Sequence, residues 1–356
     1  MRSAMTQAWV GSRVGLMGNP SDGFGGKTIA CLIQNFGAQV TVRESQTLEI
    51  VRHPIYDPLS FRSLSHLAVT AQNDGYYGGI RLLYATCKKF HDLCRERGIT
   101  LDDRAFALQY DTNIPRQVGL GGSSAIITAA VKALMEFYEL TDDDIPLPEQ
   151  PNLILAVETD ELGIAAGLQD RVVQAYGGLV YMDFAPDIME RDGHGQYLQL
   201  PISQLPPLYI AYTSIPSESG KMHNIVRHRF ENGDTEVIDA VKLWAEYTDE
   251  ARLALEIGDY GRFATLMDLN FDLRLELYGE DWLGPINLDL VSTARKVGLP
   301  AKFAGSGGAV IGCYETEKQF QDARRAFEGG GYAFGRIVPT TSTEIVTEGA
   351  LRYTAM

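Results

Sequence analysis

The strongest chemical signal in the sequence is a glycine-rich segment that precedes a long apolar run. The segment runs from Pro115 to Ala125 and contains three glycines in four residues, followed by two serines. Glycine lets a backbone adopt positive φ and pass close to a bulky anion. If a helix begins at Ser123, its free N–H groups and its dipole attract that anion. We therefore predict a phosphate-binding loop, because a plain helix cap with a flexible loop does not require so many glycines.

The predicted contacts of this loop with a phosphate-bearing ligand are its proline, its glycines, its two serines and the apolar residues beside them. They are Pro115, Gly119, Leu120, Gly121, Gly122, Ser123, Ser124 and Ala125. The two hydroxyls stand where they could cap the helix or touch a metal ion bound to the phosphates. The sequence alone leaves both possibilities open.

A second glycine turn lies near the end of the chain, from Lys302 to Ala309. By itself it is equally well explained as a tight hairpin between two apolar runs. Together with the first loop, a role in nucleotide binding is favoured, because two glycine loops can enclose one nucleotide. We predict that Gly305, Ser306 and Gly307 contact that nucleotide.

A third segment, from Ser12 to Thr28, ends in Gly-Gly-Lys-Thr and nearly matches the phosphate loop G-x-x-x-x-G-K-[ST]. The match fails, because the first glycine of that motif would fall at Ser21. A segment this rich in Asn, Asp and Gly suits recognition of hydroxyl groups, although a surface turn would have the same composition. The substrate contacts predicted here are Asn19, Asp22, Gly25, Gly26 and Lys27.

Two carboxylates, Glu158 and Asp170, lie twelve residues apart. Phosphoryl transfer needs a metal ion that neutralises the phosphates and a group that orients or deprotonates the hydroxyl. Two carboxylates could divide these roles. By itself the pair is ordinary in a chain with 46 acidic residues.

Both helices and strands must position these residues. Alternating β-branched runs predict paired strands at 39–44 and 47–52, and apolar residues at steps of three and four predict a helix at 78–97 with one apolar face. The other elements expected before residue 200 are a strand at 105–110, a one-sided helix at 123–140, a loop at 142–151, helices at 152–162 and 168–175, and a strand at 178–184.

Three prolines at 201–207 predict a domain boundary, so we expect an N-terminal domain at 1–203 and a C-terminal domain at 204–356. The second domain should begin with a strand at 208–213 and be mostly helical. The elements expected after that strand are helices at 236–257, 260–277 and 286–297, a strand–turn–strand unit at 302–314, a helix at 318–328 and a last strand at 335–339.

Composition narrows the class of protein. The chain has 356 residues and a formal charge of −15, and an acidic surface disfavours nucleic acid and anionic membranes as partners. Its four cysteines form no zinc pattern and no C-x-x-C pair, which favours reduced thiols in a cytoplasmic protein. We find no targeting segment and no apolar run long enough to span a membrane. The oligomeric state stays open.

The three glycine-containing segments and the Glu158–Asp170 pair occur in the order found in the GHMP kinases, which include galactokinase and mevalonate kinase. Ser12–Asp22 resembles that family's P-G-[RK]-V-x-L-x-G-E motif, Pro115–Ala125 resembles its P-x-x-x-G-L-[GS]-S-S-A loop, and Lys302–Gly308 resembles its K-x-[ST]-G-[AS]-G-G-G turn. The resemblance implies an α+β fold in two domains. The first would contain a left-handed βαβ unit, and the second would be ferredoxin-like.

The resemblance also implies roles for single residues. Asp170, in Gly-Leu-Gln-Asp, resembles the family's catalytic aspartate, and Arg13 resembles the basic residue that assists it and polarises the reacting hydroxyl. Glu158 resembles the Mg²⁺-binding glutamate, and Ser123 or Ser124 resembles the Mg²⁺-linked serine. Ser123 takes that role without a gap in the alignment, and Ser124 takes it if one residue is inserted. Asp22 resembles the galactokinase aspartate that binds sugar hydroxyls, so ATP, Mg²⁺ and a small sugar are the implied ligands.

Within the family, the sequences of these motifs are most similar to those of the plant-type glucuronokinases, which implies phosphorylation of D-glucuronate at C1. The carboxylate of such a substrate should be bound by a cationic side chain, and the candidates are Lys27, Arg81 and Arg171. Asn19 and Pro20 depart from the galactokinase pattern and put galactose in doubt. A kinase for a neutral sugar or heptose and a catalytically inactive sugar sensor remain as alternatives.

Overall fold

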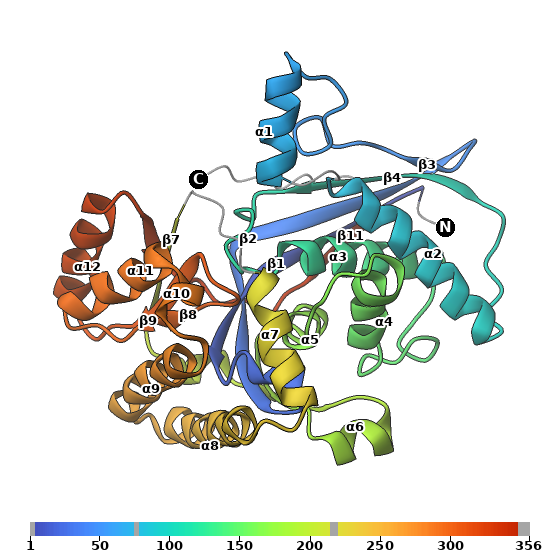
Figure 1. Cartoon of the computed structure of the whole chain (residues 1–356). Coiled ribbons are helices and arrows are strands. Elements are labelled where there is room, and N and C mark those ends of the chain that lie inside the picture. Colours follow the sequence, from blue (N-terminus) through green and yellow to red (C-terminus); the bar gives the residue numbers. More distant parts are fainter. Residues whose placement is uncertain (1–3, 75–77, 214–219, 348–356) are drawn as a thin grey trace.

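The computed structural model describes residues 4–74, 78–213 and 220–347, which form two β-sheets with helices around them (Figure 1). The first sheet has seven strands in the order β11-β1-β2-β4-β3, with β5 paired to β2 and β6 paired to β5. Its strands are β1 (Met5–Met17), β2 (Lys27–Ser45), β3 (Glu49–Ile50), β4 (Ala105–Thr112), β5 (Leu179–Asp183), β6 (Gln196–Leu200) and β11 (Glu344–Thr347).

The predicted pairing of 39–44 with 47–52 is wrong. β4 lies against that part of β2, with Val42 opposite Leu108 and Val40 opposite Tyr110, and β3 pairs in parallel with the far edge of β4. Buried apolar residues of β4 complete the core beside β2, whereas the two residues of β3 are not buried. Burial of apolar side chains therefore decides which strand takes the neighbouring place.

Four helices cover one side of the first sheet and carry much of the site: α2 (Ile80–Glu96), α3 (Gly122–Phe137), α4 (Gln150–Ala156) and α5 (Gln169–Tyr176). The helix α3 packs against both β1 and β2 and is buried on nearly every side, so the one-sided pattern predicted for it is wrong. Nearly all of its residues are apolar or small, which suits a helix enclosed by other elements. Two further helices, α1 (Leu64–Asp74) and α6 (Pro186–Asp192), were not predicted.

The second sheet has the strand order β10-β7-β9-β8, and all its pairs are antiparallel. With helices between β7 and β8 and between β9 and β10, this is the β-α-β-β-α-β pattern of a ferredoxin-like domain, which confirms the predicted fold. Its elements are β7 (Leu208–Tyr212), α7 (Gly220–Glu231), α8 (Thr235–Ile257), α9 (Tyr260–Tyr278), α10 (Glu280–Leu283), α11 (Pro285–Lys296), β8 (Lys302–Phe303), β9 (Ala309–Cys313), α12 (Glu317–Gly329) and β10 (Ala333–Arg336).

The two halves are joined at more than one point. After β10 the chain returns to the first sheet, where β11 pairs with β1, so the predicted last strand is followed by another. The boundary at 203/204 and the left hand of the βαβ crossover stay predictions. All four cysteines are free thiols, and among the described residues no helix is both long and apolar enough to cross a membrane.

Candidate active site

Most of the predicted site residues line one pocket of about 470 Å³, where the ends of both glycine loops meet. Those lining it are Arg13, Asn19, Asp22, Arg81, Pro115, Gly119, Leu120, Gly121, Gly122, Ser123, Ser124, Glu158, Asp170, Arg171, Gly305 and Ser306. They come from β1, the turn after it, α2, the loop before α3 and its first turn, the segment after α4, α5 and the turn between β8 and β9. The fold thus assembles segments from near both ends of the chain, from Arg13 to Ser306.

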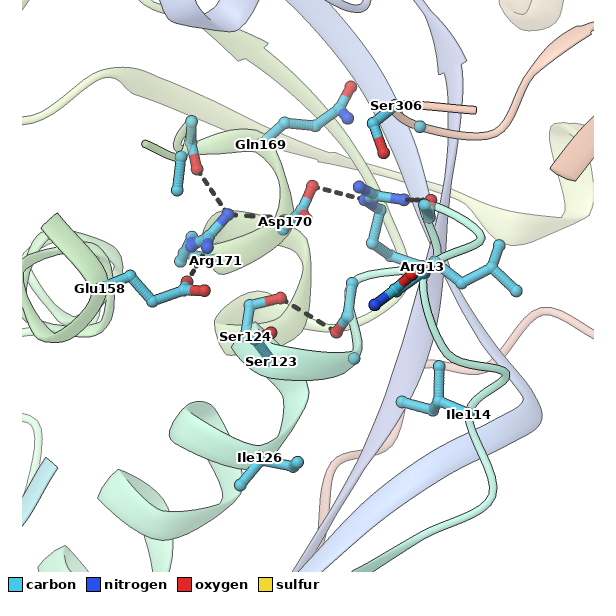
Figure 2. A pocket seen from close by; sticks show the side chains of 18 of the residues that line it. Arg13, Ile114, Ser123, Ser124, Ile126, Glu158, Gln169, Asp170, Arg171 and Ser306 are labelled. Carbon is cyan, nitrogen blue, oxygen red and sulfur yellow. Dashed lines mark hydrogen bonds and ion pairs between the residues drawn. The ribbon is translucent and has the colours of Figure 1, made fainter. Parts of the chain in front are cut away.

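In this pocket Arg13 connects Asp170 to both glycine loops (Figure 2). It is buried in β1, and its Nε donates to the Oδ1 of Asp170 at 2.5 Å. Its Nη1 donates to the carbonyl oxygens of Gly119 and Ala304, at 2.5 and 3.3 Å. One guanidinium therefore ties the catalytic candidate to both glycine loops and fixes the direction of the Asp170 carboxylate.

The loop before α3 forms an open helix N-terminus. The residue that caps α3 is Gly121, in the left-handed conformation at φ 71°, and no side chain caps the helix. Ser124 is buried and donates its hydroxyl to the Gly121 carbonyl at 3.0 Å, whereas Ser123 Oγ makes no hydrogen bond to any described residue. Free N–H groups at a helix start, with a hydroxyl beside them, suit a phosphate group.

The two glycine loops touch each other. A Cβ on Gly305 would stand 2.1 Å from the Gly119 carbonyl oxygen, and a Cβ on Gly119 would stand 2.8 Å from the Gly307 oxygen. Only glycine allows this approach, and Gly119 also has φ 68°. From behind, buried Arg274 of α9 donates to the carbonyls of Gly305 and Ser306, at 2.9 and 3.3 Å. The two loops are therefore held as a unit.

Glu158 lies in the single π-helical turn Val157–Glu161 that follows α4, a local distortion often found at functional sites. Its carboxylate forms a buried ion pair with Arg171, whose Nη1 also donates to the Gly167 carbonyl at 2.9 Å (Figure 2). Burial, with the neighbouring charge of Arg13, lowers the pKa of Arg171 to about 9. With these contacts Arg171 positions Glu158, and it leaves little of its guanidinium for a substrate.

Asp22 lies in the short 3₁₀ turn Ser21–Phe24 and accepts the backbone N–H of Gln169 at 3.2 Å. Burial, together with the nearby Asp170 carboxylate, raises the pKa of Asp22 to about 6. The turn thus brings a second carboxylate close to that of Asp170. Its remaining acceptor capacity suits a hydroxyl group of a ligand.

Five predicted contacts are not placed as expected. Lys27, the first residue of β2, does not line the pocket, because its ammonium binds Asp249 at 2.7 Å and lies 3.5 Å from Asp183. Gly25 packs on Pro186, Gly26 packs on Ser21, Gly307 packs on Asn287, and Ala125 is buried inside α3. All four serve the backbone path and do not face the pocket.

Asn19 lines the pocket, but its side chain is occupied. It is buried, its Oδ1 accepts from Lys302, and its Nδ2 lies within reach of the Phe303 carbonyl at 3.4 Å. Burial lowers the pKa of Lys302 well below its usual range, and this lysine also donates to the Gly15 carbonyl at 2.7 Å. The pair therefore joins the first motif to the third.

The sequence did not point to several residues in or behind the site, among them Lys302, Arg274, Gln169 and Arg227. Gln169 is buried and lines the pocket, and its Oε1 has no partner among the described residues. Its position next to Asp170 was a usable signal. Arg227 belongs to the segment 221–229, which holds Lys221, His223, Arg227, His228 and Arg229, an unusual concentration of basic side chains in a chain of charge −15.

The residues present fit a magnesium ion, the metal that the family implies. Among the described residues no three His, Cys, Asp or Glu side chains form a closed metal cluster. Mg²⁺ bound with a nucleotide needs only one or two protein oxygens, since phosphates and water complete its shell. Ser123 and Glu158 both line the pocket and offer such oxygens.

A helix start, two clasped glycine loops and a positioned carboxylate define a small-molecule phosphotransferase. The chain belongs to the GHMP kinase family. The model of the GHMP kinases N terminal domain matches residues 81–178, and that of the GHMP kinases C terminal domain matches residues 251–333. It is therefore an ATP-dependent kinase.

Two relatives resemble it over most of their length. Glucuronokinase 1 of Arabidopsis thaliana is 48% identical over 300 residues, which is 84% of this chain and 82% of the relative. Probable glucuronokinase 2 of the same plant is 46% identical over 342 residues, 94% of this chain and 93% of the relative. Among solved structures, a Lactococcus lactis galactokinase complexed with galactose superposes with a TM-score of 0.72 at 17% identity, over 98% of this chain and 96% of that one.

Proposed function

We propose that this kinase transfers the γ-phosphoryl group of ATP to the C1 hydroxyl of D-glucuronate, giving glucuronate 1-phosphate and ADP. The observation that carries the chemistry is the Arg13–Asp170 pair, which shares one pocket with the glycine loop at the start of α3. The choice of sugar is supported by the two glucuronokinases that resemble the chain at 46–48% identity.

In the proposed reaction the C1 oxygen forms a bond to the γ-phosphorus while the bond from that phosphorus to the β,γ-bridging oxygen breaks. ADP leaves, and the hydroxyl proton passes to the Asp170 carboxylate, as general-base catalysis requires. Arg13 holds that carboxylate and is itself held by the Gly119 and Ala304 carbonyls, so the base is positioned before the substrate binds. The N–H groups at the start of α3 stabilise the phosphates.

Bound Mg²⁺ would neutralise the phosphate oxygens and draw them into one geometry. In our proposal Ser123 supplies a hydroxyl to it and Glu158 supplies a carboxylate oxygen. Ser123 is favoured over Ser124, because the Ser124 hydroxyl already binds the Gly121 carbonyl. Arg171 keeps Glu158 in place through their ion pair.

For the sugar we propose hydroxyl contacts from Asp22 and Gln169. The carboxylate of Asp22 and the unpartnered Oε1 of Gln169 are acceptors that suit sugar O–H groups. The four free thiols fit an enzyme of the cytoplasm, which is where we place it.

The test is a coupled assay of ADP release with glucuronate, galacturonate, glucose, galactose and a heptose as separate substrates. We expect glucuronate to give the highest kcat/KM, and phosphate analysis of the product should place the new ester at C1. A higher kcat/KM for a heptose or a neutral sugar would favour the other anomeric kinases of the family. ATP binding without turnover on any sugar would instead favour a sugar sensor, a role that does not require the Arg13–Asp170 pair.

A further inference from the structure

The helix α7 brings an arginine to the wall of the pocket that carries Asp22. Arg227 lines the pocket together with the turn Ser21–Phe24, and it is half-buried there. Its Nη2 lies 3.7 Å from the point where a Cβ on residue 23 would stand, so Gly23 leaves the guanidinium room against the turn. This wall is continuous with the catalytic centre, because Asp22 accepts the N–H of Gln169, the neighbour of Asp170.

Apolar contacts hold α7 in this position. Val226 is buried in the same apolar cluster as Phe24, and the rings of Phe24 and Phe230 lie 5.2 Å apart. Val226 and Phe230 are four residues apart and therefore share one face of the helix. That face anchors α7 to the turn after β1 and places the guanidinium of Arg227, next along the chain from Val226, at the edge of the pocket.

The charge of Arg227 has no counterpart in the part of the chain that the structure describes: no ion pair or hydrogen bond joins it to a described residue. The other cations near the site are engaged. Arg13 is paired with Asp170, and Arg171 is paired with Glu158. Arg81 and Arg116 both have interactions within the protein, and Arg116 lies over the Tyr56 ring at 5.6 Å.

A guanidinium that lines a substrate pocket without an internal carboxylate suits a carboxylate of the ligand, which it can bind through two parallel N–H bonds. In a hexuronic acid, the C1 hydroxyl and the C6 carboxylate are carried by the two carbons that flank the ring oxygen. If C1 faces Asp170, the carboxylate therefore lies beyond the ring oxygen, within one sugar ring of the reacting hydroxyl. Asp22, Gly23 and Arg227 line the same pocket as Asp170, and the carboxylate of Asp22 lies close enough to that of Asp170 for burial and this neighbouring charge to raise the pKa of Asp22, so one sugar ring can reach both.

We infer that Arg227 binds the carboxylate of a uronic acid and that α7 thereby makes the kinase select sugar acids over neutral sugars. The inference rests on the proposed sugar-1-kinase activity. It replaces Lys27, which faces Asp249 and Asp183, as the carboxylate-binding cation.

The experiment compares the kcat/KM of the full-length enzyme for glucuronate with that for glucuronamide, its uncharged amide of the same shape. The variants are Arg227→Gln, Arg227→Lys and the control Arg229→Gln. Arg229 lies on the same helix but outside the pocket, where it pairs with Asp234 and Glu236, so its replacement removes the same charge from the same helix.

We expect Arg227→Gln to lower kcat/KM for glucuronate about 30- to 1000-fold, mostly through KM, as for a charge pair broken on one side. Its kcat/KM for glucuronamide should change less than about threefold, so that the preference for the acid disappears. Arg227→Lys should retain part of the preference, because a lysine supplies a point charge without the fork. Arg229→Gln should keep the preference of the wild type.

Three results would overturn the inference while leaving the kinase activity established. The first is an unchanged preference for the acid in Arg227→Gln, and the second is an equal loss for acid and amide. The third is a rise in the KM for ATP alone, which would assign Arg227 to the phosphates. If Arg227→Gln does not fold, as judged by thermal melting, Arg227→Lys decides by the same ratio. A wild-type enzyme that phosphorylates no uronic acid contradicts the proposed function itself.

Discussion

The two walls of the pocket are built by different means. The proposed phosphate side consists largely of backbone: the start of α3, which no side chain caps, and the turn after β8 approach each other through Gly119 and Gly305. The proposed sugar side consists of side chains from distant segments, chiefly Asp22 after β1 and Arg227 on α7. A loop that binds an anion through its backbone is recognisable in the sequence as a run of glycines. A sugar site made of single side chains from distant segments has no such local motif.

This difference explains where the predictions failed. On the phosphate side only Ala125 and Gly307 do not face the pocket, and each is a neighbour of residues that do. On the sugar side Lys27, Gly25 and Gly26 turn away from the pocket, and Arg227 was missed. Sequence proximity to Asp22 was a poor guide, because the 3₁₀ turn reverses the chain and aims Lys27 at α8.

Asp170 lies where the two walls meet, and its replacement should have the largest effect. Asp170→Asn keeps the shape of the side chain but removes the base and the charge that Arg13 holds. We expect kcat to fall by about 10²- to 10⁴-fold, with the Kd for ATP nearly unchanged, since our proposal assigns ATP binding to the glycine loops. Steady-state kinetics and calorimetric titration with ATP measure the two quantities. A kcat near the wild-type value would remove Asp170 from the chemistry.

Glu158 tests whether the phosphate side needs a side chain at all. Glu158→Gln should raise the Mg²⁺ concentration needed for half-maximal rate by roughly tenfold and leave the sugar KM almost unchanged, because only the metal loses a charged ligand. The change also breaks the buried pair with Arg171, so it should lower the free energy of unfolding by about 3–5 kcal/mol.

The control for that experiment is Arg171→Met, measured at a temperature at which both variants are folded. It breaks the same ion pair but keeps the carboxylate, so stability should fall while the Mg²⁺ requirement moves much less. If both variants shift the Mg²⁺ titration equally, Glu158 acts through the packing of the site and not as a metal ligand.

As with the site, some parts of the fold were predictable from the sequence and others were not. Long helices such as α8 and α9 and the unit formed by β8 and β9 follow from local periodicity, and they were predicted within a few residues. The partner of β2 was not, because the choice between β3 and β4 depends on which strand buries more apolar surface against distant helices. The network of Lys302, Asn19 and Arg274 could not be foreseen either, since each contact joins segments that meet only in the folded chain.

The pH dependence of the sugar KM tests the proposed role of Asp22. Burial beside Asp170 raises the pKa of Asp22 to about 6, so its carboxylate is ionised above that pH and takes up a proton as the pH falls through it. A protonated Asp22 loses an acceptor for sugar hydroxyls, so KM for the sugar should rise about tenfold between pH 7 and pH 5. Asp22→Asn should have a high KM that does not change over this range. A KM for ATP that rises in parallel would place the titrating group elsewhere.

The smallest effect should separate the two serines at the start of α3. Ser124 is buried and donates to the Gly121 carbonyl, so Ser124→Ala should lower the free energy of unfolding by about 1 kcal/mol, with little effect on the Mg²⁺ titration. Ser123 contacts the pocket and makes no hydrogen bond within the described residues, so Ser123→Ala should leave stability unchanged and raise the Mg²⁺ requirement by roughly three- to tenfold. Denaturant unfolding and Mg²⁺ titration of both variants measure the two effects. The opposite pattern would mean that the loop carries a one-residue insertion relative to its family and that Ser124 turns toward the metal when ATP binds. In that case a side chain would rearrange even on the backbone-built side of the pocket, and the contrast between the two walls would be weaker than the free enzyme indicates.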